Sequence, residues 1–195
     1  MHPPPISSGR KACPRRRTRG FTAIELMVTI GIAAILAALA APSFTGLMER
    51  WRVRQATEGL KDTLYYARSE AIKRGGNVVI QKSGNANGCT TSSVDDWDCG
   101  WIVCNDTNGN GTCNSSEPVL QRFLSPQNVE VTRPSASGNA KIELDRWGTV
   151  AGTFVGFSLV PKGATTSNPA ARGVCMSSGG RVRITSNPPC DSQNP

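Results

Sequence analysis

Residues 20–41 read GFTAIELMVTIGIAAILAALAA, an almost entirely apolar run near the N-terminus. From position 21 onward every side chain in it is apolar except those of Thr22, Glu25 and Thr29. Twenty-one helical residues span about 31 Å, which matches the hydrocarbon core of a bilayer, about 30 Å. Residues 1–19 carry six arginine or lysine residues and no acid. Because positive flanks stay in the cytoplasm, we expect a transmembrane helix with its N-terminus inside and its C-terminus outside.

Glu25 is the unusual residue of this segment, because a carboxylate at bilayer depth is costly unless it has a partner. It either reaches water from an interfacial position or has a function. Its surroundings favour a function. A basic leader, the sequence Gly20-Phe21-Thr22-x-x-Glu25 and an uninterrupted apolar run together resemble the class III signal of type IV prepilins.

The resemblance to prepilins implies roles for individual residues. It implies that a prepilin peptidase cuts between Gly20 and Phe21 and then methylates the new amine of Phe21. It also implies that Glu25 pairs in the filament with the Phe21 amine of a neighbouring subunit, since an opposite charge offsets the burial of an acid. Pro42 lies where pilins commonly carry a proline, and its ring and missing N–H favour a kink in the helix there.

The net charge of +8 overstates how basic the mature chain is. Six of the 22 basic residues lie in the leader, so the mature chain has 16 basic and 14 acidic residues and a net charge of +2. Nucleic-acid binding would therefore need a local basic patch. We expect four regions, which are a cleaved leader (1–20), a transmembrane and filament-core helix (21–41), an amphipathic extension (42–75) and a periplasmic β-rich domain (76–195).

The segment after Pro42 has the pattern of an amphipathic helix. Apolar residues recur every three or four positions, at Val53, Ala56, Leu60, Leu64, Ala67 and Ala71. The sequence Lys73-Arg74-Gly75-Gly76 is a helix stop, because basic residues suit the negative end of the helix dipole and glycine caps it. We therefore expect one helix over about 21–74, kinked near Pro42, whose outer half packs on the globular domain.

Short β-branched segments separated by glycine, proline, asparagine and serine follow from residue 77 onward. They predict strands at 78–82, 101–105, 119–124, 129–132, 141–145, 153–160, 174–177 and 181–185. The expected fold class is α+β, a long N-terminal helix packed on a small antiparallel β-sheet sandwich. This architecture, with Gly100-Trp101-Ile102-Val103 leading to Asp106, resembles the FimT/GspH family of minor pilins and pseudopilins.

Seven cysteines are present, and Cys13 belongs to the leader. The other six predict three disulfides in an oxidising periplasm; they are Cys89, Cys99, Cys104, Cys113, Cys175 and Cys190. Six cysteines allow fifteen pairings, of which we favour Cys175 with Cys190 and the other four among themselves. A zinc site is the competing interpretation, but the cysteine spacing and the lack of any histidine beyond His2 argue against it.

No catalytic motif is recognisable, so we expect that the protein is not an enzyme and uses no cofactor. One loop nevertheless resembles a metal site, because residues 106–117 read DTNGNGTCNSSE and fit the EF-hand pattern. Its candidate calcium ligands are Asp106, Asn108, Asn110, Thr112 and Glu117. Only two of these side chains are charged, and the flanks are expected to be strands. A hairpin rich in Asn-Gly turn residues is therefore the alternative.

The C-terminal part contains Gly180-Arg181-Val182-Arg183. In a strand Val182 would face the core while Arg181 and Arg183 face water, where their guanidinium groups offer planar pairs of donors to phosphate. The motif resembles the DNA-binding motif of FimT-type minor pilins used in natural transformation, which implies that Gly180, Arg181 and Arg183 bind DNA. Arg172 is added on charge alone. The alternative is an edge strand whose arginines prevent aggregation.

Together these features predict a FimT-like minor pilin that binds extracellular DNA without sequence preference and takes part in DNA uptake. Its expected partners are other major and minor pilins, prepilin peptidase, DNA and, before assembly, the inner membrane. We expect a single-pass inner-membrane protein with a periplasmic C-terminal domain that later reaches the pilus at the cell surface. The alternatives are a GspH-like pseudopilin of a type II secretion system and a structural minor pilin that primes pilus assembly.

Overall fold

A computed structural model of the chain describes residues 20–84, 89–134, 140–150 and 155–190, with the side chains of 40–43 excepted. The chain divides into two compact units, Met1–Pro42 and Ser43–Pro195. One long helix, α1 (Ala23–Arg74), contributes to both units.

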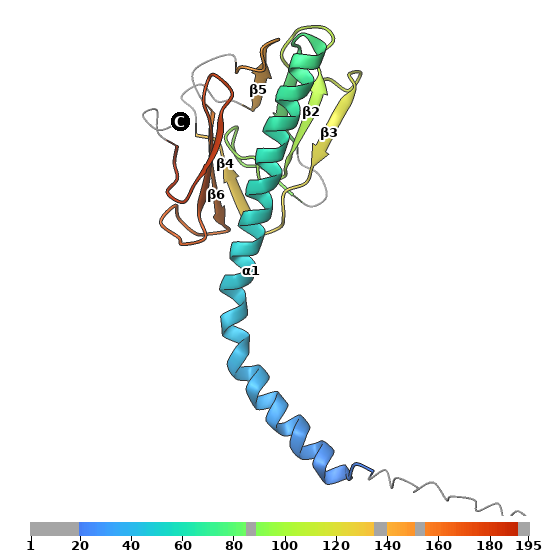
Figure 1. The fold of residues 1–195 in the computed structure, drawn as a ribbon, viewed down its shortest axis with the longest axis vertical. Helices are drawn as coiled ribbons and strands as arrows, with labels where there is room; N and C mark the ends of the chain where they lie inside the picture. Colours follow the sequence, from blue (N-terminus) through green and yellow to red (C-terminus); the bar gives the residue numbers. More distant parts are fainter. Residues whose placement is uncertain (1–19, 85–88, 135–139, 151–154, 191–195) are drawn as a thin grey trace, which may run out of the picture. The chain divides into compact units, whose positions relative to one another are not determined.

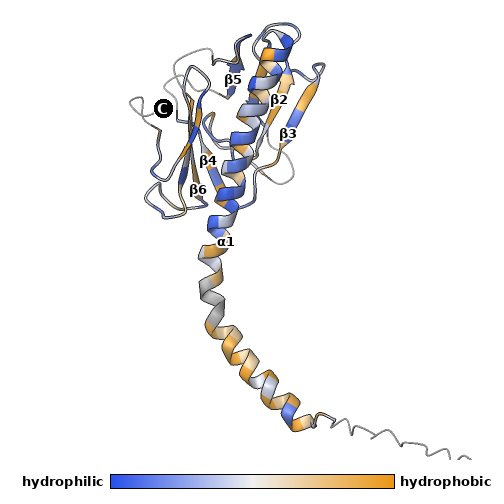
Figure 2. Ribbon diagram, in the orientation of Figure 1, coloured by the Kyte–Doolittle hydropathy of each residue, from blue (hydrophilic) through white to orange (hydrophobic). Residues whose placement is uncertain are grey.

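In the first unit α1 begins at Ala23, and most of its ribbon in Figure 2 has the orange colour of hydrophobic residues. The large apolar side chains of this stretch are exposed in the single chain; Phe21, for example, is 81% exposed. Among the described residues no single helix is long and apolar enough to cross a membrane, whereas Ala23–Leu39 and Phe44–Arg74 taken together meet that test by length and composition. The kink expected at Pro42 stays a prediction, because Pro42 lies outside the described side chains.

In the second unit α1 is amphipathic, as the sequence predicts. The six apolar residues of the predicted stripe, from Val53 to Ala71, are fully buried. The helix ends at Arg74, and the Gly76 N–H donates to the Ala71 carbonyl over 2.8 Å. Gly75 adopts a φ of +79°, the left-handed conformation that glycine takes readily at a helix end.

Eight short strands build two antiparallel sheets against α1 (Figure 1). The first sheet has the order β3-β2-β1-β5 and the second has the order β4-β6-β7-β8. The strands are β1 (Val78–Lys82), β2 (Trp101–Asn105), β3 (Val119–Phe123), β4 (Val129–Thr132), β5 (Lys141–Leu144), β6 (Val155–Pro161), β7 (Arg172–Met176) and β8 (Val182–Thr185). All eight predicted strands are present, and the described ends differ from the prediction by at most two residues. The predicted start of the sixth strand, at residue 153, lies outside the described residues.

Buried side chains from α1 and both sheets form one hydrophobic cluster. Trp101 donates its indole N–H to the Thr63 hydroxyl over 2.9 Å, and its ring stacks on that of Phe123 at 4.6 Å. Trp97 meets Phe157 edge to face at 5.1 Å between ring centroids. The aromatic residues therefore tie the helix and the two sheets together, since Thr63 belongs to α1, Trp101 to the first sheet and Phe157 to the second.

Three disulfides complete the Ser43–Pro195 unit. They join Cys89 to Cys99, Cys104 to Cys113 and Cys175 to Cys190. The Cys175–Cys190 pair is the one favoured from the sequence, and the other four cysteines pair among themselves as expected. All cluster residues and all three disulfides lie in this unit, so it has a complete core without residues 1–42.

Candidate functional site

The arginine motif of the C-terminal part lies at a tight turn between β7 and β8. The Gly180 N–H donates to the Ser177 carbonyl over 2.8 Å, and the Ser177 N–H donates to the Arg181 carbonyl over 2.9 Å. Gly180 has a φ of +83°, a backbone conformation that residues with a Cβ rarely adopt. The turn therefore requires glycine at the position directly before Arg181.

This turn is fixed against two other parts of the fold. Arg68 of α1 donates from Nη1 to the Gly180 carbonyl over 2.8 Å, and a Cβ added at Gly180 would lie 2.9 Å from the Gly148 carbonyl oxygen. The neighbouring turn around Gly148 is itself ordered by Asp145, which accepts hydrogen bonds from the Thr149 hydroxyl and amide. The bond from the Thr149 hydroxyl, more than any other interaction, lowers the pKa of Asp145. The motif is therefore presented by a rigid turn.

The alternation along β8 agrees with the prediction. Val182 and Ile184 pack against the hydrophobic cluster, whereas Arg181 is exposed. Arg183 pairs in register with Cys175 and therefore lies on the face that carries the Cys175–Cys190 disulfide. Arg183 is only half exposed, and its Nε atom is buried, which the sequence did not predict.

Arg172 does not belong with this pair, and grouping it with Arg181 and Arg183 on charge was wrong. In β7, Arg172 shares a face with Val174, which pairs with Ile184, so it lies on the opposite side of the sheet from Arg183. Its Nη1 donates to the carbonyls of Pro169 and Ala171, at 3.1 and 2.6 Å. The alternation of side chains along a strand would have placed Arg172 and Arg183 on opposite faces of the sheet if the pairing of β7 with β8 had been known.

Arg172 instead lies with two arginines of α1. Arg50, Arg54 and Arg172 line one groove together with Thr57, Glu58 and Ile184. The grouping of these three arginines was not predicted from the sequence, although the spacing of four between Arg50 and Arg54 places them on one helix face. The sequence does not show that Arg172 of β7 lines the same groove as Arg50 and Arg54.

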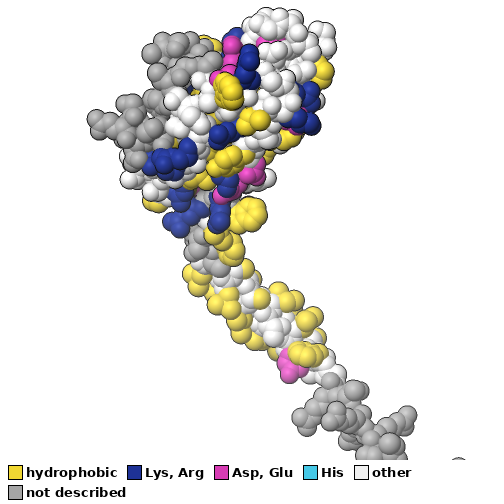
Figure 3. Space-filling model, turned by 45° about the horizontal axis from the view of Figure 1, so that its top comes forward, with side chains coloured by type: hydrophobic (Ala, Val, Ile, Leu, Met, Phe, Trp, Pro, Cys, Tyr) yellow, Lys and Arg dark blue, Asp and Glu magenta, His cyan; other side chains and the backbone are white. Residues whose placement is uncertain are grey.

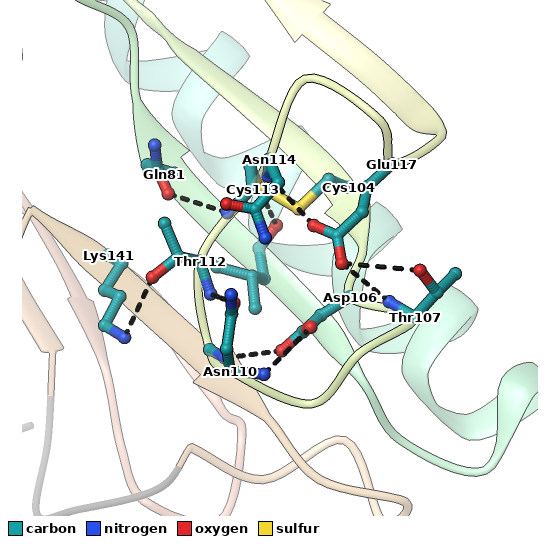
Figure 4. The surroundings of a disulfide bond; sticks show 12 residues. Gln81, Cys104, Asp106, Thr107, Asn110, Thr112, Cys113, Asn114, Glu117 and Lys141 are labelled. Atoms are coloured by element: carbon teal, nitrogen blue, oxygen red, sulfur yellow. Dashed lines mark hydrogen bonds between the residues drawn. A yellow bond between two sulfur atoms is a disulfide. The ribbon is translucent and has the colours of Figure 1, made fainter.

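The loop of residues 106–117 connects β2 to β3 and is shown in Figure 4. The Asp106 carboxylate, which is buried, accepts hydrogen bonds from the amides of Gly109, Asn110 and Gly111 at 2.6–3.2 Å. The buried Glu117 carboxylate accepts bonds from the amides of Thr107 and Asn114, both at 2.9 Å. The Cys104–Cys113 disulfide holds the same loop.

The five candidate calcium ligands do not fit a calcium cage in this arrangement. The side-chain oxygens of Asn108 and Asn110 accept local amide bonds, and the Thr112 hydroxyl accepts one from the Lys141 ammonium. The carboxylates of Asp106 and Glu117 likewise point at backbone amide donors. The side-chain oxygens of the loop therefore accept hydrogen bonds from the chain itself rather than converge on a cation. Among the described residues no group of three or more acidic, histidine or cysteine side chains has the arrangement of a metal site. The geometry corresponds to the alternative interpretation, a turn-rich hairpin.

Replacing Asp106 by alanine tests this assignment. We expect the free energy of unfolding to fall by about 2–4 kcal/mol, because three backbone amides lose a buried charged acceptor. The measurement is thermal or denaturant unfolding of the Ser43–Pro195 unit in a chelating buffer, with Asn108→Ala, an exposed position, as the control. A loss of stability that appears only when calcium is added would mean that Asp106 is a metal ligand instead.

Glu25 completes a capping box at the start of α1. The Thr22 amide and hydroxyl donate to the same Glu25 carboxylate oxygen at 3.0 and 2.9 Å. The Glu25 amide in turn donates to the Thr22 hydroxyl at 3.3 Å. This reciprocal arrangement is the standard way in which Thr-x-x-Glu satisfies the free amides of a helix N-terminus. This capping box was not predicted from the sequence, although Thr22-Ala-Ile-Glu25 matches its Thr-x-x-Glu pattern.

The comparison with protein families decides the classification. A family model described as type II transport protein GspH matches residues 56–180, which include the last part of α1 and strands β1 to β7. The protein belongs to the GspH family. A second model, the prokaryotic N-terminal methylation motif, matches residues 15–41 of this GspH-family protein. The motif and the N-terminal helix indicate membrane anchoring of the pilin type, and the pilin family implies contacts with other pilins.

Individual relatives are similar to parts of the GspH-family protein. Type II secretion system protein H of Xanthomonas campestris is 33% identical over 73 residues, which make up 36% of this chain and 43% of the relative. Type IV major pilin protein PilA of Myxococcus xanthus is 30% identical over 132 residues, 55% of this chain and 60% of the relative. The matches therefore span less than two thirds of either relative.

Solved structures share the fold of the GspH-family protein. The type IV minor pilin FimU of Pseudomonas aeruginosa matches with a TM-score of 0.54 at 20% identity, over 74% of this chain and 92% of that chain. A second crystal form of FimU gives a TM-score of 0.50 at 21% identity, over 72% and 94% of the two chains. The predicted α+β architecture and the predicted resemblance to FimT/GspH-like minor pilins are confirmed.

Replacing Glu25 by alanine in this GspH-family protein should leave leader cleavage intact and reduce incorporation into filaments. The acid is expected to pair with the Phe21 amine of a neighbouring subunit, and an alanine removes that charge. The measurement is the ratio of filament-associated to membrane-associated protein. Thr22→Ala is the control, because it removes the capping box but keeps the carboxylate. Normal incorporation of the Glu25 variant would contradict the pairing.

Proposed function

We propose that this protein is a minor pilin of the type IV pilus machinery that binds extracellular DNA for uptake in natural transformation. The observation that carries the proposal is the turn that leaves Arg181 exposed directly before edge strand β8. This turn is fixed by Arg68 and by the disulfide of Cys175. Arg181 and Arg183 are proposed to contact phosphates, and Gly180 to permit the turn. The role is proposed to be binding rather than catalysis.

The chemistry of the turn fits a phosphate backbone. Guanidinium groups present paired donors in a plane, and a rigid backbone lowers the entropy that is given up when they bind. Phosphate contacts supply affinity without reading bases, so binding should be independent of sequence. A mature net charge of +2 provides little general attraction, so affinity should depend on these local groups.

The proposed life cycle follows from the N-terminal segment. Prepilin peptidase is proposed to remove residues 1–20 and methylate Phe21 while the chain is held in the inner membrane. The β-rich unit would then lie in the periplasm, and assembly with major and minor pilins would carry it to the cell surface.

A GspH-like pseudopilin of a type II secretion system is the second candidate. It is supported by the family model and by the likeness to protein H of Xanthomonas campestris. Such a protein would contact other pseudopilins and would have no reason to bind DNA. A structural minor pilin that primes assembly makes the same prediction, and neighbouring genes for pilus or secretion components would separate the two.

DNA binding by the Ser43–Pro195 unit tests the proposal. Arg181→Ala should weaken binding about tenfold for every DNA sequence, since the substitution removes one charge-assisted hydrogen-bond donor group. On duplex DNA the log–log slope of affinity against salt should become shallower by about 0.9 for each phosphate that the variant no longer neutralises. Arg183→Ala should act in the same direction, although its buried Nε makes a check of the melting temperature necessary.

Two further variants make this test specific. Arg181→Lys should bind more tightly than Arg181→Ala but less tightly than the wild type, because lysine keeps the charge and lacks the planar pair of donors. Arg122→Ala on β3 removes an exposed arginine from the other sheet and should leave binding unchanged. If Arg181→Ala binds like the wild type with the same salt slope, the pseudopilin interpretation becomes the better one.

A further inference from the structure

A basic groove lies between α1 and the β7–β8 edge of the second sheet. It has a volume of about 320 Å³ and is lined by Arg50, Arg54, Thr57, Glu58, Arg172 and Ile184. Figure 3 shows basic side chains gathered beside α1 on this unit, close to large hydrophobic ones. Two secondary-structure elements therefore bring three guanidinium groups to one concave surface.

The charges of the groove suit a phosphate-bearing ligand. Glu58 is the only acid in its lining, and its carboxylate is paired with Lys61. In the part of the chain that the structure describes, no carboxylate lies within salt-bridge distance of Arg50 or Arg54. Paired guanidinium donors match the oxygens of a phosphate. The Thr57 hydroxyl, which donates a hydrogen bond to the Val53 carbonyl, lines one side of the groove.

An exposed apolar stripe runs along the same part of α1. Phe44, Leu47, Met48 and Trp51 recur at spacings of three and four, and Trp51 is 66% exposed. The stripe faces away from the core, since Trp51 and the buried Val53 are about 200° apart around the helix. Such a combination of aromatic, aliphatic and arginine side chains is typical of the boundary between lipid and water.

The groove is also close in sequence to the apolar segment that anchors the chain. Arg50 follows Pro42 by eight residues, and a helix of that length rises by about 12 Å. Headgroups add about 10–15 Å to the hydrocarbon core in total, which is about 5–8 Å on each side of a bilayer. Basic residues that follow a membrane segment within a few helical turns suit contact with the phosphates of lipid headgroups.

We propose that the groove of Arg50, Arg54 and Arg172 binds the phosphate of an anionic phospholipid headgroup while the subunit waits in the membrane before assembly. A lipid surface explains both halves of the site, because it accepts the apolar stripe and supplies the phosphates. A nucleic acid would use the arginines but leave Phe44, Leu47 and Trp51 in water. The proposal depends on membrane anchoring and is independent of DNA binding by Arg181.

Vesicle binding by the Ser43–Pro195 unit tests the proposal. The unit should sediment with vesicles that contain phosphatidylglycerol and much less with vesicles of phosphatidylcholine alone. Arg50→Ala and Arg54→Ala should each weaken this binding about fivefold, and together about 25-fold, since each arginine near an anionic surface contributes a similar amount. Arg122→Ala, which removes the same charge elsewhere, should have little effect. In nanodiscs, phosphatidylglycerol should raise the melting temperature of the full chain but not that of the double variant.

Vesicle binding and DNA binding together distinguish the groove from the basic turn of Arg181 and Arg183. Arg181→Ala should leave vesicle binding intact, and the Arg50/Arg54 double variant should leave DNA binding intact. Equal binding to both kinds of vesicle, or an equal loss for Arg122→Ala, would overturn the proposal, because the attraction would then not be located in the groove. A double variant that loses DNA binding and keeps vesicle binding would assign the groove to nucleic acid instead.

Discussion

Gly100→Ala should prevent stable folding of the Ser43–Pro195 unit, with a loss of at least about 4 kcal/mol in the free energy of unfolding. Gly100 has a φ of +93°, and a Cβ at this position would lie 2.1 Å from the Phe123 carbonyl oxygen and 2.9 Å from the Ser125 amide nitrogen. Both atoms belong to backbone that continues from β3, so neither can move without separating β3 from β2. Since whole domains are stable by only about 5–15 kcal/mol, this change is large.

The same substitution at Gly179 is a matched control. There the nearest atom to an added Cβ is the Ser177 hydroxyl at 4.0 Å, and we expect the stability to change by about half a kcal/mol or less. The measurement is denaturant unfolding of both variants with the wild type. Similar midpoints for Gly100→Ala and Gly179→Ala would show that β2 and β3 can separate at little cost, which contradicts the packing of Trp101 on Phe123.

Gly20→Leu should leave the entire precursor uncut in the membrane. The N-terminal methylation motif covers residues 15–41, and a small residue at the position before Phe21 is what the expected peptidase requires. Mass spectrometry of the wild type should find a mature chain that begins with a methylated Phe21, whereas the variant should keep residues 1–20. Without cleavage Phe21 has no free amine for Glu25 of a neighbour, so filament incorporation should also be abolished.

Gly31→Ala is the control for processing, because it adds a side chain within the apolar segment at a position where nothing lies within 4 Å of the new Cβ. It should be cut and methylated normally. A mature wild-type chain that begins at any residue other than Phe21 would contradict the assignment of the cleavage site.

Local patterns in the sequence were sufficient for the helix and the strands. The apolar spacing from Val53 to Ala71 predicted the buried face of α1 because a helix repeats every 3.6 residues whatever it packs against. The strands followed from β-branched residues between turn formers. Strand order was not predictable in the same way, since the pairing of β1 with β5 joins segments about 60 residues apart and depends on tertiary packing.

The candidate sites show the same division between local and distant information. The alternation of Arg181 with Val182 is a local property, and it was predicted correctly. The face on which Arg172 lies depends on the register between β7 and β8, so charge alone assigned it to the wrong site. The EF-hand pattern is similarly undecided by local sequence, because the spacing of oxygen atoms does not specify whether they point toward a cation or toward backbone amides, as those of Asp106 do in the structure.

The order of the disulfides has a consequence for how the chain matures. Each cysteine is bonded to the next one along the mature chain, with separations of 10, 9 and 15 residues. A polypeptide that enters an oxidising compartment from residue 43 onward therefore exposes every thiol together with its correct partner before the following pair emerges. Oxidation in order of emergence then produces the native connectivity directly, and export should depend on a thiol oxidant but not on a disulfide isomerase.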